Sequence, residues 1–247
     1  MKNRVLFCIL MLLLLTVSCS KKTQGISNIS GRITDAPGQL LKLQELGMQE
    51  SKTIDSVILD SKGDFSFSIF SKPTGLYLLS LPHVQLLVVE LNKGDSVKVN
   101  SSLKSFPFGA SFSASDNSRD LLDFFNITNG NRKIYDSLES TLLTHQYDPD
   151  FALLSRKLDE SLKPLWEKQR ELEITYIDRH LSSLTALLIL NQGLGSSPVL
   201  TFKDDSVYFL KLDSSLSRAF PGNMHAVFHH KRIIQEREMA AMKKNYR

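Results

Sequence analysis

The chain has 247 residues, with 30 Lys and Arg against 26 Asp and Glu, a formal net charge of +4 and a sequence pI near 9.0. Acidic and basic residues are interleaved without a stripe of Lys, Arg and aromatic residues, so the basic pI does not indicate a nucleic-acid-binding protein. The two cysteines, Cys8 and Cys19, are too few for a disulfide framework, and stability has to come from an apolar core.

The N-terminus has the pattern of a secretory leader. Lys2 and Arg4 precede a wholly apolar run over residues 5–15, and Thr16, Val17 and Ser18 then lead to Cys19. A membrane-spanning helix needs about 20 apolar residues, and this run is shorter. We therefore prefer a cleaved leader to the alternative, an uncleaved anchor helix.

The stretch 14–19, Leu-Leu-Thr-Val-Ser-Cys, resembles the end of a bacterial lipoprotein signal peptide. The resemblance implies a signal peptide over residues 1–18 and lipidation of Cys19, which becomes the first mature residue. It predicts a lipid-anchored protein of the cell envelope, attached to the membrane through Cys19 and facing the periplasm. Loss of Lys2 and Arg4 lowers the net charge to +2, and lipidation of Cys19 leaves no free thiol.

The pattern from residue 29 onward predicts a β module. Polar residues 19–28 are expected to form a tether, and residues 29–102 contain short β-branched and aromatic runs between turn residues. Phe65, Phe67 and Ile69 alternate with serines, as in a half-buried strand. We predict seven strands, at residues 29–34, 40–46, 53–59, 65–70, 75–81, 85–91 and 96–100.

The short connections favour an antiparallel β-sandwich or barrel, because a parallel crossover needs a dozen or more residues. We expect the best-marked hairpin at residues 55–69, where Gly63 can take the positive φ of a tight turn, and a similar turn at 92–95. Residues 77–79 and 87–89 are apolar without alternation, which predicts strands covered on both faces.

Residues 113–247 are expected to form an all-helical domain, so the whole chain is predicted to be an α+β protein. Helical spacing and caps predict a helix that starts at 115–116 and ends at 129–131, and a second one through 134–142. A long helix should open at 148–150 and be kinked or divided at Pro164. Further helices are expected over residues 183–190, 204–216 and 224–244.

The β module resembles domain of unknown function 4369, a β-rich module near the N-terminus of envelope lipoproteins. The residues that carry the resemblance are Ile29–Ile33 (ISGRI), 54–57 (IDSV), 63–67 (GDFSF), 77–81 (YLLSL) and 89–95 (VELNKGD). In that family a helical insert and a thioredoxin-like domain of thiol-disulfide oxidoreductases usually follow. The helical half is similar to the insert, but the sequence contains no Cys-x-x-Cys, so the resemblance does not extend redox activity to this chain.

The sequence offers few candidates for chemistry, and we predict no catalytic residue, no cofactor and no metal site. His225 and His229 stand four residues apart and could share a metal, but two ligands do not make a site, and we expect a solvated helix face. Glu167, Glu171 and Glu173 lie among Lys and Arg, and no carboxylate pair is expected in an apolar setting. His180 lies near Asp178, without the Gly-x-Ser-x-Gly of a hydrolase.

These observations predict a non-catalytic binding or accessory module rather than an enzyme. Two alternatives remain open. One is a metal-dependent envelope hydrolase that uses the helical half. The other is a redox partner that works with a thioredoxin-like protein supplied in trans, docking on apolar residues of the last helix, namely Ile233, Ile234, Met239 and Met242.

Overall fold

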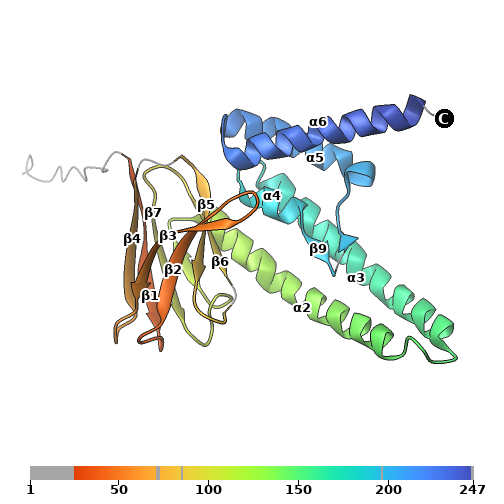
Figure 1. Ribbon diagram of the computed structural model, residues 1–247, viewed down its shortest axis with the longest axis horizontal. Helices are drawn as coiled ribbons and strands as arrows, with labels where there is room; N and C mark the ends of the chain where they lie inside the picture. The colour runs from red at the N-terminus through yellow and green to blue at the C-terminus, as the bar shows by residue number, and fades with distance from the viewer. Residues whose placement is uncertain (1–24, 71–72, 85, 196, 246–247) are drawn as a thin grey trace, which may run out of the picture.

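The computed structural model describes residues 25–70, 73–84, 86–195 and 197–245. The expected signal peptide, Cys19 and most of the tether lie outside the described residues. The described chain is an α+β protein in which a β-sandwich is followed by five helices (Figure 1).

The sandwich consists of two open four-stranded sheets, which confirms the predicted sandwich and excludes a closed barrel. The first sheet has the order β4-β1-β7-β8, and the second has the order β3-β2-β5-β6. All seven predicted strands are present; β8 was not predicted, and β1 includes the last three residues of the expected tether. The strands are β1 Ile26–Thr34, β2 Leu40–Leu46, β3 Ser51–Ile58, β4 Asp64–Phe70, β5 Gly75–Ser80, β6 Leu87–Leu91, β7 Ser96–Ser102 and β8 Ser111–Ser113.

Two predictions about strand pairing are wrong. Residues 55–69 do not form a hairpin, because β3 pairs with β2 whereas β4 pairs with β1 in the other sheet. The turn before Gly63, whose φ is +75°, instead carries the chain from one sheet to the other. The sandwich is also not wholly antiparallel: β1 and β7 run parallel, with Asn28 opposite Ser96. The four strands of the second sheet lie between β1 and β7 in the sequence. The chain therefore returns to β7 through the other sheet and not through a single crossover connection.

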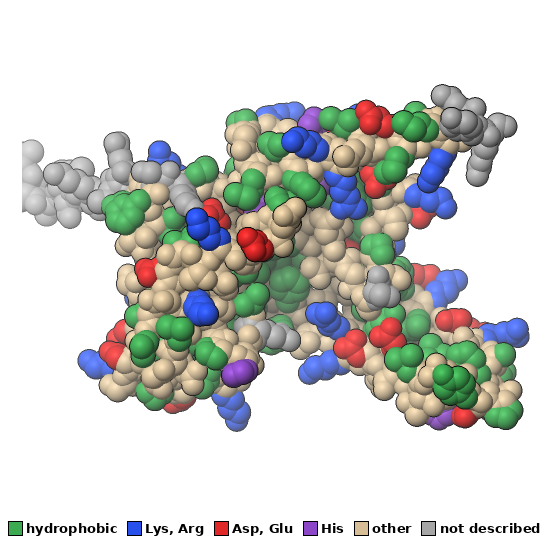
Figure 2. Space-filling model, viewed as in Figure 1, with side chains coloured by type: hydrophobic (Ala, Val, Ile, Leu, Met, Phe, Trp, Pro, Cys, Tyr) green, Lys and Arg blue, Asp and Glu red, His purple; other side chains and the backbone are tan. Residues whose placement is uncertain are grey.

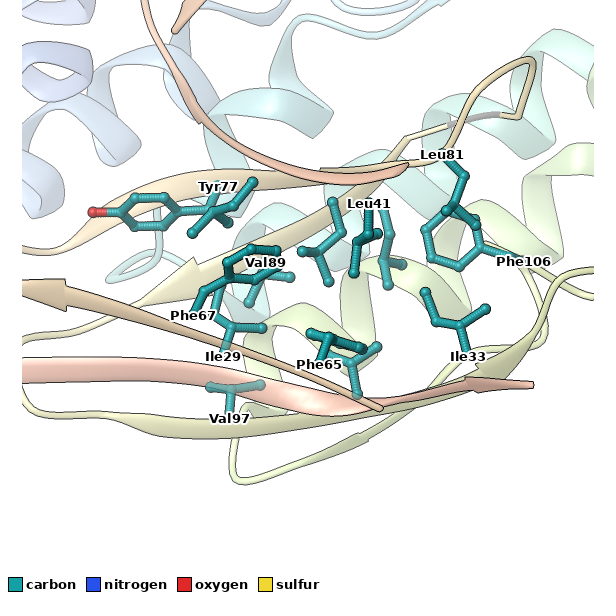
Figure 3. Packing of buried hydrophobic residues seen from close by; sticks show 14 of the residues in the cluster. Ile29, Ile33, Leu41, Phe65, Phe67, Tyr77, Leu81, Val89, Val97 and Phe106 are labelled. Carbon is teal, nitrogen blue, oxygen red and sulfur yellow. The ribbon is translucent and has the colours of Figure 1, made fainter. Parts of the chain in front are cut away.

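The core of the sandwich lies between the inner faces of the two sheets (Figure 3). Ile29, Phe67 and Val97 from the first sheet meet Leu41 and Val89 from the second, and all five are at most 1% exposed. Each such side chain stabilises the fold by about 1.5–3 kcal/mol. The alternation seen in the sequence therefore correctly identified the inward face of each strand.

The second sheet is buried on both faces, as predicted for the unalternating runs 77–79 and 87–89. Tyr77 and Leu79 face the sandwich core, whereas Leu76 and Val88 pack against a second apolar cluster formed by the helices. This cluster includes Phe124, Ile177, Leu190 and residues of the last two helices. The sheet and the helical half therefore share one continuous packed interior.

Two long helices form an antiparallel arm that projects away from the sandwich (Figure 1). They are α2, Asp116–Thr144, and α3, Phe151–Arg179. The predicted stop at residues 129–131 is wrong, because α2 continues through Gly130; a helical glycine costs only about 1 kcal/mol relative to alanine. Pro164 lies inside α3 and does not divide it.

The rest of the helical half is compact. It contains α4 Thr185–Leu190, α5 Phe202–Ala219 and α6 Met224–Asn245, close to the predicted ranges. A two-stranded hairpin, β9 Gly193–Leu194 and β10 Ser197–Pro198, interrupts the expected all-helical pattern. None of the described helices combines the length and the hydropathy needed to cross a bilayer.

Candidate functional site

A cleft of about 520 Å³ opens between strand β6, helix α2 and the β9 hairpin. Its volume falls in the range of small-molecule and peptide sites, about 300–1,000 Å³. In Figure 2 the molecule is hollowed between the sandwich and the helical arm. The apolar wall of the cleft is formed by Leu86, Leu87, Val88, Pro107, Phe108, Leu121, Leu122, Phe125 and Leu194.

The opposite end of the cleft is polar. Arg132, Lys133 and Asp136 project from one exposed stretch of α2, and Thr128, Asn129, Gln169, Gln192 and Gly193 complete the lining. Neither Arg132 nor Lys133 forms an ion pair with a described residue. The cleft therefore combines an apolar wall with a local excess of positive charge, an arrangement that suits a ligand with one apolar and one anionic part.

A buried chain of amides connects this polar end to the interior. Asn131 donates from Nδ2 to Gln169 Oε1 at 3.1 Å, and Gln169 donates from Nε2 to Glu173 Oε1 at 3.0 Å. All three side chains are at most 5% exposed. Gln169 is thus held by a partner on each side while it lines the cleft, so its amide is pre-oriented for a ligand.

Glu173 corrects the expectation of a solvated acidic face on α3. Its side chain is fully buried, and Oε2 has no hydrogen-bond partner among the described residues. Burial raises the pKa of Glu173 to about 8, the hydrogen bond from Gln169 opposes this rise, and the charge of Asp205 adds to it. Asp205, also buried, is paired with Arg170 and accepts from the Thr201 N–H. Glu173 is consequently neutral at pH 7.

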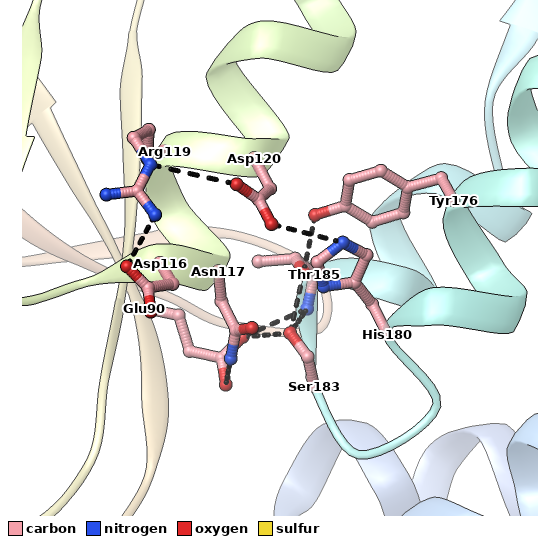
Figure 4. A network of polar contacts seen from close by, with 9 residues as sticks. All are labelled: Glu90, Asp116, Asn117, Arg119, Asp120, Tyr176, His180, Ser183 and Thr185. Atoms are coloured by element: carbon pink, nitrogen blue, oxygen red, sulfur yellow. Dashed lines mark hydrogen bonds and ion pairs between the residues drawn. The ribbon is translucent and has the colours of Figure 1, made fainter.

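A second buried acid, Glu90, joins the second sheet to the start of α4 (Figure 4). Its carboxylate accepts hydrogen bonds from the Ser183 hydroxyl, the Thr185 N–H at 3.3 Å and Asn117 Nδ2 at 3.2 Å. Burial raises the pKa of Glu90, and these donors oppose the rise. The network fastens β6 to the helical half, and the buried Ser183 hydroxyl, being already engaged, is not presented to a substrate.

His180 lies beside a carboxylate and is partly buried. Its Nε2 lies 3.5 Å from Asp120 Oδ2, and its ring stacks on Tyr176 with centroids 4.2 Å apart (Figure 4). Burial lowers the pKa of His180, although Asp120 opposes the shift. The predicted neighbour Asp178 instead bonds Lys211 at 2.6 Å. Tyr176 donates to Thr185 Oγ1 at 2.9 Å, which links His180 indirectly to the Glu90 network.

His225 and His229 are buried, and the expected solvated face is wrong for both. His225 Nε2 donates to the Leu46 carbonyl at 3.0 Å, and His229 Nε2 donates to the Phe209 carbonyl at 3.2 Å. These bonds occupy the Nε2 atom of each ring, so neither Nε2 is available to a metal ion. Within the described ranges, no group of three or more His, Cys, Asp or Glu side chains is placed to hold a metal ion.

The possible docking face on α6 is only partly available. Ile233 is 1% exposed and packs inward, whereas Ile234, Met239 and Met242 are exposed. The predicted lipidation site, Cys19, lies outside the described residues.

Glu90 and Glu173 escaped prediction although the sequence contains a signal for each. Glu90 interrupts an apolar strand that is buried on both faces, where a charge is unusual. Glu173 and Gln169 follow Leu165 at steps of four, so they lie on the apolar stripe of α3 and not on its charged face. Polar residues on an apolar stripe are the pattern that identifies such buried groups.

Comparisons with known proteins show no family. No protein-family model matches the chain, and no curated protein matches it. Two of the solved structures that match are similar over little more than a third of the chain. An (S)-allantoin synthase matches with 11% identity and a TM-score of 0.27 over 38% of this chain and 45% of its own length. A 5-hydroxyisourate hydrolase of Klebsiella pneumoniae matches with 15% identity and a TM-score of 0.26 over 37% of this chain and 99% of its own. Scores this low carry no argument about function.

Proposed function

We propose that this chain is a lipid-anchored protein of the bacterial cell envelope that binds a ligand or partner in the cleft beside β6. The cleft is the observation that carries the binding role, because it joins an apolar wall to Arg132 and Lys133, two cations without an ion-pair partner among the described residues. The leader and the lipoprotein-like stretch that ends at Cys19 support the membrane attachment. The resemblance to the β module of envelope lipoproteins supports an accessory role.

The anchoring is tested by radioactive palmitate incorporation and by membrane fractionation in bacteria. Cys19→Ser should abolish palmitate incorporation and release the protein from washed membranes. Cys8→Ser is the matched control, because Cys8 lies within the expected leader and should leave both properties unchanged. Palmitate incorporation that survives Cys19→Ser would overturn the anchor.

The binding role is tested with 8-anilinonaphthalene-1-sulfonate, an anionic dye with an apolar ring system that matches the two ends of the cleft. The full-length chain in detergent micelles should show one saturable site above the micelle background. Asn129→Trp fills the cleft and should remove that site. Ser140→Trp, on an exposed position of the same helix, should leave it in place. No saturable site, or equal effects of the two variants, would contradict a binding cleft.

The accessory role without catalysis is tested by a disulfide reductase assay with the same preparation. We expect no turnover above that of a chain with Cys19→Ser. Measurable turnover by the wild-type chain would contradict the proposal, because thiol-disulfide exchange requires a thiolate.

The exposed residues of α6 support a second candidate, a docking surface for a thioredoxin-like partner in trans. Ile234→Glu combined with Met239→Glu should abolish co-purification of such a partner from envelope extracts. Val207→Glu, a change at an exposed apolar residue of α5, is the matched control. Wild-type protein that emerges from the extracts without a thioredoxin-like protein would count against this candidate.

A further inference from the structure

Strand β6 forms an edge of the second sheet. Among the described strands, β6 has a neighbour on one side only, β5, so half of its backbone hydrogen-bonding groups point away from the sheet. At Glu90 these outward groups are satisfied by side chains from the start of α2. The Glu90 N–H donates to Ser118 Oγ at 2.8 Å, and the Ser115 hydroxyl donates to the Glu90 carbonyl at 3.3 Å. The backbone groups of Glu90 are therefore not available to pair with an added strand.

The same edge is open two residues earlier. Backbone groups alternate in direction along an antiparallel strand, so Val88 points its N–H and C=O the same way as Glu90, away from Leu78 on β5. No side chain or turn among the described residues reaches the Val88 N–H or carbonyl in the way that Ser115 and Ser118 reach Glu90. Val88 is also among the residues that line the cleft.

We propose that the cleft binds an extended peptide segment that adds a strand to β6 at Val88 and places a carboxylate near Arg132 and Lys133. This inference rests on the proposed binding function and names the class of ligand. A paired backbone donor and acceptor on an exposed strand edge is matched by the backbone of another extended chain. A simple fatty acid would cover the apolar wall and leave both groups without partners, which is unfavourable in a desolvated site.

The side chains around the edge fit the same ligand. Side chains of an added strand alternate, so one set would contact Leu122, Phe125 and Phe108 on the apolar wall. The cations are on α2 at the polar end, where Asp136 offsets only one of the two positive charges. An acidic side chain or a free C-terminus at that end of the peptide complements the remaining charge. Gln169, held by Asn131 and Glu173, supplies a fixed amide beside it.

The test uses an array of fluorescein-labelled hexapeptides with a free C-terminus. Val, Leu or Phe alternates with Ser or Thr, and each peptide ends in Asp. Binding to the full-length chain in detergent is measured by fluorescence polarisation. We expect a subset to bind at one site with micromolar affinity. The absence of any binder at about 1 mM peptide, a concentration at which even weak binding of about −4 kcal/mol is detectable, would overturn the proposal.

Backbone pairing is tested by methylating the peptide nitrogens. Methyl groups on alternate residues remove the donors along one edge of the extended peptide, and the complementary set removes those along the other edge. Only the edge that faces Val88 should matter, so one set should weaken binding by about tenfold, and the other should change it by less than about twofold. Equal effects of the two sets would show that the peptide backbone does not hydrogen-bond to the edge of β6.

Charge recognition is tested by reversing the cations. Arg132→Glu with Lys133→Glu should weaken the best peptide by at least about fivefold. Arg156→Glu with Lys157→Glu makes the same charge change on exposed residues of α3 outside the cleft lining, and should change binding by less than about twofold. Equal weakening by both pairs of substitutions would show that the peptide responds only to the overall charge of the protein. That result would overturn the assigned carboxylate site.

A fatty acid probe separates this inference from the proposed function. If decanoate displaces anilinonaphthalene sulfonate and no peptide of the array binds, the cleft takes a small amphiphile and the peptide inference fails, while the binding function stands. If neither the dye nor any peptide binds, both fail.

Discussion

Glu173 accepts a hydrogen bond of 3.0 Å from Gln169, one turn earlier on α3, and this amide is also part of the cleft wall. The second carboxyl oxygen of Glu173 is buried and has no hydrogen-bond partner among the described residues. A buried acid beside a candidate ligand site therefore holds one of its wall residues in place. A carboxylate in this position is unfavourable, so the acid is expected to keep its proton at neutral pH.

Glu173 should make the protein less stable in alkaline solution. Its pKa is raised by burial from an ordinary value of 4.5 to about 8, so between these values the folded chain holds a proton that the unfolded chain has lost. The contribution of Glu173 to the free energy of unfolding is then largest below pH 4.5. It declines by roughly 5 kcal/mol in total as the pH rises to 8. Glu173→Gln should remove this decline, and urea unfolding at pH 5, 7 and 9 measures it. Parallel wild-type and variant curves would contradict the assignment.

The Glu90 network should contribute measurably to stability. Ser183→Ala removes a buried hydroxyl that donates to Glu90, and we expect a loss of about 1–3 kcal/mol in unfolding free energy. Ser182→Ala, at the neighbouring exposed serine, should change it by no more than about 0.5 kcal/mol. Chemical denaturation of both variants gives the comparison. A similar small effect at both positions would mean that the network does not fasten β6 to α4.

His225 and His229 should make the protein sensitive to acid. Burial lowers the pKa of both rings, so below about pH 6.5 the unfolded chain binds protons that the folded chain does not. The contribution of the two neutral rings to the free energy of unfolding is complete above pH 6.5. It is lost as the pH falls from 6.5 through the lowered pKa values. The double change His225→Gln/His229→Gln should flatten the acid limb of a plot of thermal midpoint against pH. His230→Gln, which removes the neighbouring exposed ring on the same helix, is measured in parallel.

Gly31 should be intolerant of any side chain. A Cβ at this position would lie 1.7 Å from the Val99 carbonyl oxygen on the parallel neighbour β7, so Gly31→Ala should cost about 4 kcal/mol or more, or prevent folding. Gly94 has a φ of +83° and open space around it, and Gly94→Ala should cost only about 1–2 kcal/mol for the left-handed backbone. Soluble yield and urea midpoints report the difference. Equal losses would show that β1 and β7 do not approach closely.

Strand pairing depends on contacts that a local sequence pattern does not contain. The alternation of Phe65, Phe67 and Ile69 identified β4 and its buried face, and Gly63 marked the turn. The same local pattern fits a hairpin and a chain that passes between two sheets. Which partner is chosen depends on contacts with strands far away in the sequence, such as Ile29 opposite Phe67, and these have no local signature.

Local signals also misplaced buried polar residues. His229 and Glu173 each stand beside charged residues in the sequence, and this neighbourhood suggested solvated helix faces. The packing of α6 on α5 and of α3 on α2 buries one face of each helix, and the two residues lie on those faces. The cleft could not be predicted for the same reason, since its lining comes from five separated stretches of the chain.

The sequence by itself determined the α+β class, the positions of seven strands and the last three helices, and the expectation of a lipid anchor at Cys19. Hydrophobic periodicity and turn residues are local properties, and they are sufficient for these predictions. Only the tertiary structure decided the parallel pairing of β1 with β7, the burial of Glu90 and Glu173, and the open edge at Val88 inside a cleft. These features depend on which surfaces meet when distant segments pack together, and no short window of sequence contains that information.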